Sequence, residues 1–359
     1  MKKKSPPIIT LTAIAISLLI ISVYIFSRFS VSLSDFVNST ASAWFRRFMA
    51  TLTSSLPFSL FEIVIYSLVP IVIAVILFAV RAFRRGRAKV FLLRLTSALL
   101  LIYSGHLVAL GFAYNTTTLQ SKLSLTPVEV TEERLASAMI TLRDEANALA
   151  PECDATLGYT SSGYNLAKIS EKICDSYATL SDKYSFIPDF YSNVKGVGFS
   201  TGLSYLGLTG IYTYYTGEAN VNTQYPDYKL VFTSAHELAH QRGILRENEA
   251  NFMAYLVLRS SDDQYLRYSA ALNMYQYVAS ALYSTNRELY YDIASGLCDS
   301  ARLDIRRSSE ITLTYGDTFI ADISDFVNDL FLKSNGTEGV VSYGLVVRLT
   351  LSYLEGKES

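Results

Sequence analysis

Three long apolar stretches in the first third of the chain constrain its fold more than any other feature. They occupy residues 8–26, 58–80 and 90–113. The first has no charged residue, the second has one acid near its start, and the third carries Arg94 near one end. Each is long enough to cross a bilayer, where a helix satisfies all of its own backbone polar groups. We therefore expect residues 1–113 to form a membrane region with three transmembrane helices.

Basic residues around these stretches predict their orientation. Three lysines precede the first stretch, and five basic residues crowd the short loop between the second and the third: Lys2, Lys3, Lys4, Arg81, Arg84, Arg85, Arg87 and Lys89. Such residues mark the cytoplasmic side. A smaller opposing set, Arg28, Arg46 and Arg47, then lies outside. We predict a multi-pass cell-membrane protein that has a cytoplasmic N-terminus and carries its remaining domain outside the cytoplasm.

The charge of the chain is divided unevenly between its two parts. Residues 1–113 hold twelve of the 31 Lys and Arg but only two of the 32 acids, Asp35 and Glu62. The rest of the chain therefore has nineteen basic and thirty acidic residues. An acidic domain repels phosphates, so we expect no nucleic-acid partner. The lipid bilayer is the expected partner of the membrane region.

The remainder is expected to be a linker at 114–130 and an extracytoplasmic domain at 131–359. Apolar residues at helical spacing predict helices near 131–149, 165–184, 262–283 and 287–298, and a tail with a helix from 318, a turn at 334–336 and a last helix at 343–354. Gly, Thr and Tyr dominate residues 196–222, which predicts a strand or hairpin. We expect either an edge strand beside a peptide-binding cleft or a packed Tyr-rich strand.

Three cysteines, Cys153, Cys174 and Cys298, lie in the predicted outside domain. Their spacing matches no zinc motif. Cys153 and Cys174 are a possible disulfide pair, but buried unpaired thiols fit the sequence equally well.

His236, Glu237 and His240 form an H-E-x-x-H motif. Histidines four apart in a helix lie on one face, so their imidazoles converge on one point. The glutamate that follows the first histidine lies beside that point, where it can accept a proton from a metal-bound water. The competing interpretation is an ordinary amphipathic surface helix. We favour a zinc site with Glu237 as general base.

A hydrolytic zinc ion needs a third protein ligand and an open position for water. Glu247 and Glu249 are the candidates, because Gly243 can end the motif helix in a left-handed turn and let a second helix start near Glu247. Residues two apart do not share a helix face, so we expect only one of these carboxylates to reach the metal. The sequence spacing alone does not decide whether Glu247 or Glu249 is the third ligand.

A resemblance favours Glu247. The run Glu247-Asn248-Glu249-Ala250-Asn251 resembles the E-x-x-A-[DN] element of glutamate-zincin peptidases. That resemblance implies Glu247 as a zinc ligand and Asn251 as a residue that orients a histidine ligand. The spacing departs from the family pattern, because only six residues separate His240 from Glu247.

The chain also resembles the domain of unknown function 3810 family of bacterial membrane proteins. Three blocks carry the resemblance: GLTGIYTYYTGEANVN, HELAHQRGILRENEANFMAYL and NDLFLKSNGTEGVVSYG, within about residues 60–354. The resemblance implies a membrane anchor and a zinc-peptidase-like domain, and no substrate.

Together these features predict a mainly α fold with a small β element, in which transmembrane helices precede a zincin-like metallopeptidase domain. The expected activity is zinc-dependent hydrolysis of a peptide or protein substrate. A non-catalytic zinc-binding envelope protein or sensor, and a zinc amidase acting on a cell-wall amide, are the alternatives. Proximity in sequence alone nominates four oxyanion donors: Tyr212, Tyr214, Tyr215 and Tyr228.

Overall fold

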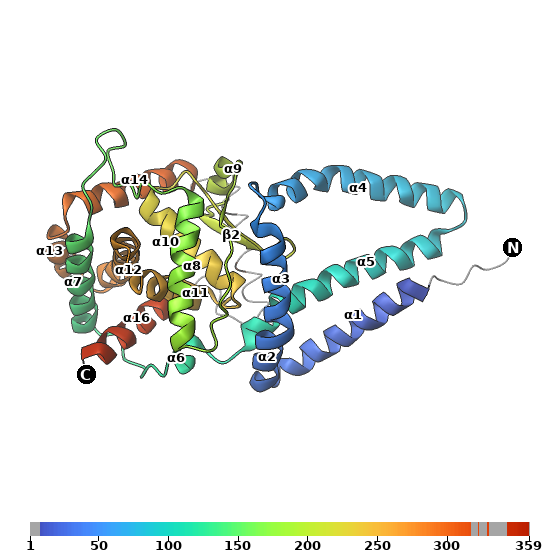
Figure 1. Ribbon diagram of the computed structural model, residues 1–359, viewed down its shortest axis with the longest axis horizontal. Coiled ribbons are helices and arrows are strands. Elements are labelled where there is room, and N and C mark those ends of the chain that lie inside the picture. Colours follow the sequence, from blue (N-terminus) through green and yellow to red (C-terminus); the bar gives the residue numbers. More distant parts are fainter. Residues whose placement is uncertain (1–7, 317–321, 323–328, 330–342, 359) are drawn as a thin grey trace.

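The computed structural model describes residues 8–316, 322, 329 and 343–358. The fold is mainly helical with one small three-stranded sheet, as the sequence predicts. Three long helices project from one end of a globular part that contains the sheet and most other helices (Figure 1).

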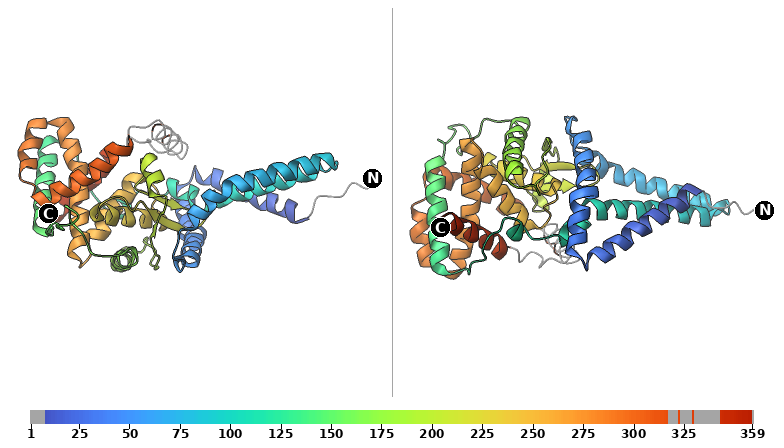
Figure 2. Two further views of the ribbon diagram at one scale, coloured as in Figure 1. Left: turned by 90° about the horizontal axis from the view of Figure 1, so that it is seen from above. Right: turned by 60° about the horizontal axis from the view of Figure 1, so that its bottom comes forward.

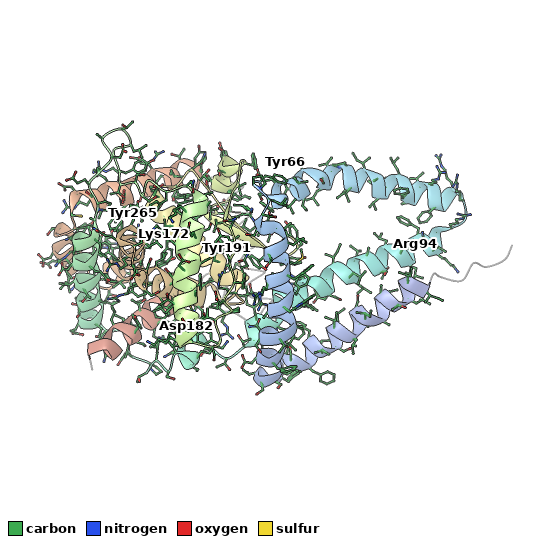
Figure 3. The ribbon with its side chains drawn as sticks, in the orientation of Figure 1. Tyr66, Arg94, Lys172, Asp182, Tyr191 and Tyr265 are labelled. Atoms are coloured by element: carbon green, nitrogen blue, oxygen red, sulfur yellow. The ribbon has the colours of Figure 1, made fainter. Side chains whose placement is uncertain are left out.

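The projecting helices are α1 (Ile8–Ser27), α4 (Leu60–Arg84) and α5 (Ala88–Ala109). Each is long and apolar enough to cross a membrane, and few of their residues are buried. The start of α1 and the turn between α4 and α5 lie at the end remote from the globular part (Figures 1 and 2). Tyr66 and Arg94 lie on these helices, whereas Lys172 and Tyr265 lie on the globular part (Figure 3).

A nearly continuous helical run crosses between the projecting helices and the globular part (Figure 1). It comprises α2 (Val31–Val37), the π-helix η1 (Asn38–Ser42) and α3 (Ala43–Ser54). Arg46 of α3 is 1% exposed and donates hydrogen bonds to the carbonyl oxygens of Ala109 (3.0 Å) and Asn38 (3.1 Å). One guanidinium thus joins the end of α5 to the crossing helices.

The segment expected to be a linker packs closely at its start. After the 3-10 helix η2 (Gly111–Asn115), α6 (Leu119–Lys122) places the Leu119 side chain in the main core. The backbone N–H and the hydroxyl of Thr117 donate to the Asp35 carboxylate at 3.0 and 2.5 Å. Residues 114–122 therefore join the crossing helices to the globular core.

The globular core is helical. It comprises α7 (Glu132–Leu149), α8 (Leu166–Lys183), α10 (Asp227–Gln241), α11 (Glu247–Arg259), α12 (Gln264–Thr285), α13 (Arg287–Ser295), α14 (Asp299–Gly316) and α16 (Tyr343–Glu358). The helices predicted from apolar periodicity near 131–149, 165–184, 262–283, 287–298 and 343–354 are confirmed. Residues 299–316 form a helix that was not predicted. The predicted helix from 318 and turn at 334–336 lie outside the described residues.

The sheet has the order β1-β3-β2, and the short helix α9 (Ser200–Tyr205) separates β1 from β2. Strands β2 (Gly210–Thr213) and β3 (Glu218–Val221) form the predicted hairpin, with Gly210 opposite Val221 and Thr213 opposite Glu218. Strand β1 (Lys195–Gly196) runs parallel to β3 on its other side. Strand β2 is thus an edge strand, which leaves one side of its backbone free of strand pairing within the described chain.

Two carboxylates cap helices across the junction between α4 and the sheet region. Glu218 of β3 accepts hydrogen bonds from the backbone N–H groups of Leu60 (3.0 Å) and Phe61 (2.9 Å) at the start of α4. Glu62 of α4 in turn accepts bonds from Gly198 (3.0 Å) and Phe199 (2.9 Å), next to α9. Because carboxylates satisfy the unpaired N–H groups of helix starts, these contacts fix α4 to the globular part.

The three cysteines are free. Cys174 is buried, whereas Cys153 and Cys298 are partly exposed. The structure therefore agrees with the unpaired-thiol interpretation rather than with a Cys153–Cys174 bridge.

Candidate metal centre

Helix α10 and the start of α11 bring three ligand-type side chains together. His236 and His240 stand one turn apart on α10, with their ring centroids 4.5 Å apart. Glu247, the first residue of α11, places Oε2 3.2 Å from His236 Nε2 and Oε1 3.6 Å from His240 Nε2. Ligand atoms of all three lie within 4.8 Å of one another. The structure thus brings together the two histidines and the glutamate that the resemblance favours.

The turn between the two helices makes this convergence possible. Gly243 has a φ of +91°, a left-handed conformation that glycine adopts without strain. The Gly243 N–H donates to the His240 carbonyl (2.9 Å) and the Ile244 N–H to the Ala239 carbonyl (3.1 Å), which closes α10 in a Schellman-type cap. The predicted helix end at Gly243 is confirmed.

The same turn orients His240. Its Nδ1 lies 2.9 Å from the carbonyl oxygen of Ile244. A carbonyl can only accept, so Nδ1 carries the proton and Nε2 keeps its lone pair directed toward Glu247. A backbone acceptor that fixes the tautomer is a common feature of histidine metal ligands.

Glu249 points away from the cluster. Its Oε1 accepts hydrogen bonds from the Leu119 backbone N–H and the Arg246 guanidinium, both at 2.9 Å, and the side chain is 9% exposed. Arg246 also donates to the carbonyl oxygens of Tyr114 and Thr116. Glu249 therefore anchors the segment after α5, whereas Glu247 faces the histidines.

Glu237, which follows His236 on α10, is buried next to this cluster. The residue is 4% exposed, and its Oε2 is a buried oxygen for which the described part of the chain offers no hydrogen-bond partner. Gly210 at the start of β2 packs directly against it, because a Cβ there would lie 2.6 Å from Glu237 Oε1. A buried carboxylate oxygen without a partner is costly unless a proton, water or ion satisfies it.

Burial and mutual charge set the protonation of the cluster. Burial raises the pKa of Glu237 to about 8, although His236 opposes the shift. Burial also lowers the pKa of His240 to about 4, despite the opposing charge of Glu247. Although burial alone raises the pKa of Glu247, His240 and His236 outweigh this effect and lower it to about 2. Near neutral pH, Glu247 is thus ionised and His240 is neutral, which are the forms that bind a metal.

Asn251, one turn after Glu247, lies close enough to His236 to affect its pKa. Burial lowers the pKa of His236, but Glu247, Glu237 and the side chain of Asn251 together raise it. The buried Nδ1 of His236 has no well-aligned hydrogen bond to any described residue. Asn251 is thus next to His236, and the E-x-x-A-[DN] resemblance implies that Asn251 orients a histidine ligand.

The three side chains fit a zinc ion. Zinc sites are tetrahedral, with ligand bonds of about 2.0–2.2 Å to nitrogen and oxygen, so neighbouring ligand atoms are about 3.3 Å apart. His236 Nε2 and His240 Nε2 lie 3.2 and 3.6 Å from the two different oxygens of the Glu247 carboxylate, close to that spacing, and the ligand atoms of all three residues lie within 4.8 Å of one another. Two imidazoles and one carboxylate form a ligand set that is typical of hydrolytic zinc and leaves a fourth position for water.

Sequence reasoning missed Tyr114, which follows α5. Burial, and to a smaller extent the charge of Glu247, raises the pKa of its hydroxyl.

The four tyrosines that the sequence offered as oxyanion donors lie in different surroundings. Tyr228 is buried in the core with its hydroxyl 3.3 Å from Gln276, and Tyr214 packs against His106. No local pattern marks Tyr114, because the fold brings it to Glu247 from 133 positions away.

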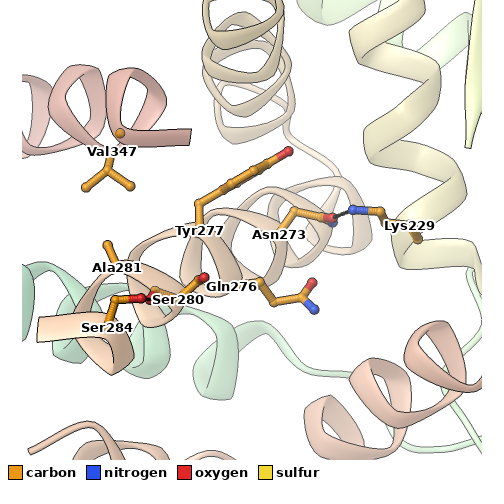
Figure 4. Close-up of a pocket in the computed structure, with 9 residues that line it drawn as sticks. Lys229, Asn273, Gln276, Tyr277, Ser280, Ala281, Ser284 and Val347 are labelled. Atoms are coloured by element: carbon orange, nitrogen blue, oxygen red, sulfur yellow. Dashed lines mark hydrogen bonds between the residues drawn. The ribbon is translucent and has the colours of Figure 1, made fainter. Parts of the chain in front are cut away.

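A separate pocket of about 470 Å³ lies between α10, α12 and α16 (Figure 4). Its lining includes Lys229, Asn273, Gln276 and Tyr277. The Lys229 ammonium donates to the Asn273 side-chain oxygen at 3.2 Å. None of its lining residues belongs to the His236, His240 and Glu247 cluster.

Comparison with known families identifies the chain. The family described as "Protein of unknown function (DUF3810)" matches residues 38–351. The chain belongs to the DUF3810 family. The match begins at η1, so this DUF3810 region includes the crossing helix α3, two of the projecting helices and the whole His/Glu cluster. No curated protein and no solved structure shows significant similarity to the chain.

Proposed function

We propose that this DUF3810 protein is a membrane-anchored zinc metallopeptidase with a zincin-like domain. The observation that carries the proposal is the convergence of His236 Nε2, His240 Nε2 and the Glu247 carboxylate, with the buried carboxylate of Glu237 beside them. His236, His240 and Glu247 would hold the zinc ion. Asn251 and the Ile244 carbonyl would keep the two imidazoles in place.

The chemistry divides between the ion and the protein. When held by these three residues, zinc would supply a Lewis acid that lowers the pKa of a water molecule and polarises the scissile carbonyl. Glu237 takes the proton of the attacking water and delivers it to the leaving amine. Its buried Oε2 accepts no hydrogen bond from the described part of the chain, so this oxygen is available to carry the proton.

Strand β2 is the expected platform for the peptide. It is an edge strand, and its first residue, Gly210, contacts Glu237. An extended substrate could add to this edge by main-chain hydrogen bonds, which would place its backbone next to the proton carrier.

The proposed location is the cell membrane, with the globular part outside the cytoplasm. Arg84 and Arg85 at the end of α4 lie at the tip remote from the globular part, at the same end as the start of α1 (Figure 1). Basic residues favour the cytoplasmic side, so the globular part at the opposite end faces out. A reporter fused after Tyr353 should be active outside the cytoplasm, and a cytoplasmic result would overturn this orientation.

The activity is tested with the full chain in detergent and an internally quenched peptide library of mixed sequence. We expect wild type to cleave the library and Glu237→Gln to retain zinc while losing about 100- to 10,000-fold in rate, the usual contribution of general acid–base catalysis. Equal hydrolysis by both proteins would refute the role of Glu237. Zinc binding without hydrolysis in wild type would favour a non-catalytic metal site.

A further inference from the structure

Helix α3 has two faces of opposite character. Trp44, Phe48 and Leu52 recur every four residues and are 66%, 50% and 60% exposed. The rings of Trp44 and Phe48 stack with centroids 5.4 Å apart. Arg46 and Ala50 on the opposite face are buried. A contiguous apolar stripe of this kind on an otherwise packed helix marks an interaction surface.

The buried face of α3 holds the globular part closely. A Cβ at Gly217, in the hairpin turn after β2, would lie 2.5 Å from the Cβ of Met49. A Cβ at Gly243 would lie 2.3 Å from the Arg46 guanidinium. Gly243 is three residues beyond His240, so Arg46 links α3 directly to the turn that completes the metal centre.

The position of α3 identifies what covers its apolar stripe. The helix lies across the base of the three projecting helices, where they meet the globular part (Figures 1 and 2). Its buried Arg46 bonds to Ala109, the last residue of α5. If α5 spans the bilayer, a helix at this level lies at the boundary between headgroups and acyl chains. Tryptophan concentrates at this depth, and the exposed Arg47 beside the stripe suits lipid phosphate.

We propose that α3 is an interfacial helix whose Trp44, Phe48 and Leu52 stripe binds the lipids of the outer leaflet. Its opposite face then holds the metal-site turn at the membrane surface through Arg46. The inference rests on the membrane location in the proposed function and does not depend on catalysis.

The chain provides its own probe, because Trp44 is its single tryptophan. The full chain is reconstituted in phosphatidylcholine vesicles that carry bromine either close to the headgroups or near the ends of the acyl chains. We expect a blue-shifted emission that shallow bromine quenches more than deep bromine and that aqueous iodide leaves largely unquenched. Emission that iodide quenches and brominated lipid does not would overturn the proposal. A blue-shifted emission that neither quencher affects would instead indicate that a second copy of this chain covers the stripe, and would also overturn the proposal.

Two variants in a Trp44→Phe background calibrate the depth. Val72→Trp lies near the middle of α4, where 54% of the native side chain is exposed, and should be quenched most by deep bromine. Tyr291→Trp lies on α13 at an exposed position and should respond only to iodide. If deep bromine quenches Val72→Trp but no brominated lipid quenches Trp44, the interfacial role of α3 is refuted and the membrane location is not. If no brominated lipid quenches Val72→Trp either, the proposed membrane location is refuted as well.

Discussion

The carboxylate of Glu247 lies 3.2 Å from the Nε2 atom of His236, although the two residues belong to different helices. The cap at Gly243 reverses the chain between them. The contact is therefore a property of the whole helix–turn–helix unit from His236 to Asn251.

Asn251→Ala should weaken zinc binding by about 10- to 100-fold, the usual effect of losing a group that orients a ligand. The reason is the proximity of its side chain to His236. Asn248→Ala, three positions earlier on the same helix, is the matched control and should bind zinc like wild type. Competition with a fluorescent zinc chelator measures both, and equal affinities would remove Asn251 from the site.

Gly210→Ala should reduce peptide hydrolysis by about 100-fold while leaving zinc content unchanged. The added methyl group would lie 2.6 Å from both Glu237 Oε1 and Thr233 Cγ2, so these two side chains of α10 must move, and a displacement of about 1 Å in a catalytic group is enough for this loss. Gly344→Ala, where no atom lies within 4 Å of the new Cβ, is the control. Unchanged hydrolysis in Gly210→Ala would show that the position of Glu237 does not limit the rate.

Lys229→Met should stabilise the protein near pH 7 and lose that effect near pH 10. Burial lowers the pKa of Lys229 from 10.5 to about 8, so the folded state disfavours the charged lysine. The loss of folding stability from burying the charged Lys229 is fully present below pH 8. It disappears as the pH rises through 10.5, where the unfolded chain also loses the proton. We expect the free energy of unfolding to rise by about 1–2 kcal/mol near pH 7. This is less than the pKa shift alone implies, because the pocket admits some water and the hydrogen bond to Asn273 is lost.

Thermal unfolding of Lys229→Met and wild type at several pH values measures this effect. Lys168→Met is the control, because Lys168 forms a half-exposed pair with Glu171. A difference in Tm between Lys229→Met and wild type that stays constant from pH 7 to pH 10 would contradict the explanation.

Local sequence patterns were sufficient for the features that depend on neighbouring residues. The apolar stretches predicted α1, α4 and α5, and Gly243 predicted the end of α10, because helix length and a left-handed turn are decided within a few residues. The hairpin of β2 and β3 followed from its Gly, Thr and Tyr content in the same way.

Contacts between distant segments could not be predicted. Glu247 and Glu249 differ in role because Leu119 and Arg246 hold the Glu249 carboxylate, and Leu119 lies 130 positions away. Tyr114, from the segment after α5, likewise lies near enough to Glu247 for the charge of Glu247 to affect its pKa. No periodicity encodes such pairs, so sequence geometry alone left both carboxylates open.

The most direct test of the central claim is the zinc content of the purified full-length chain, measured for wild type, Glu247→Gln and Glu249→Gln. We expect one zinc ion in folded wild type and in Glu249→Gln, whose amide oxygen still accepts the hydrogen bond from the Leu119 N–H. Glu247→Gln should lose more than about 100-fold in zinc affinity, beyond the effect of an orienting residue. Folded wild type without zinc would refute the metal site, and zinc lost from Glu249→Gln but kept in Glu247→Gln would refute Glu247 as its third ligand.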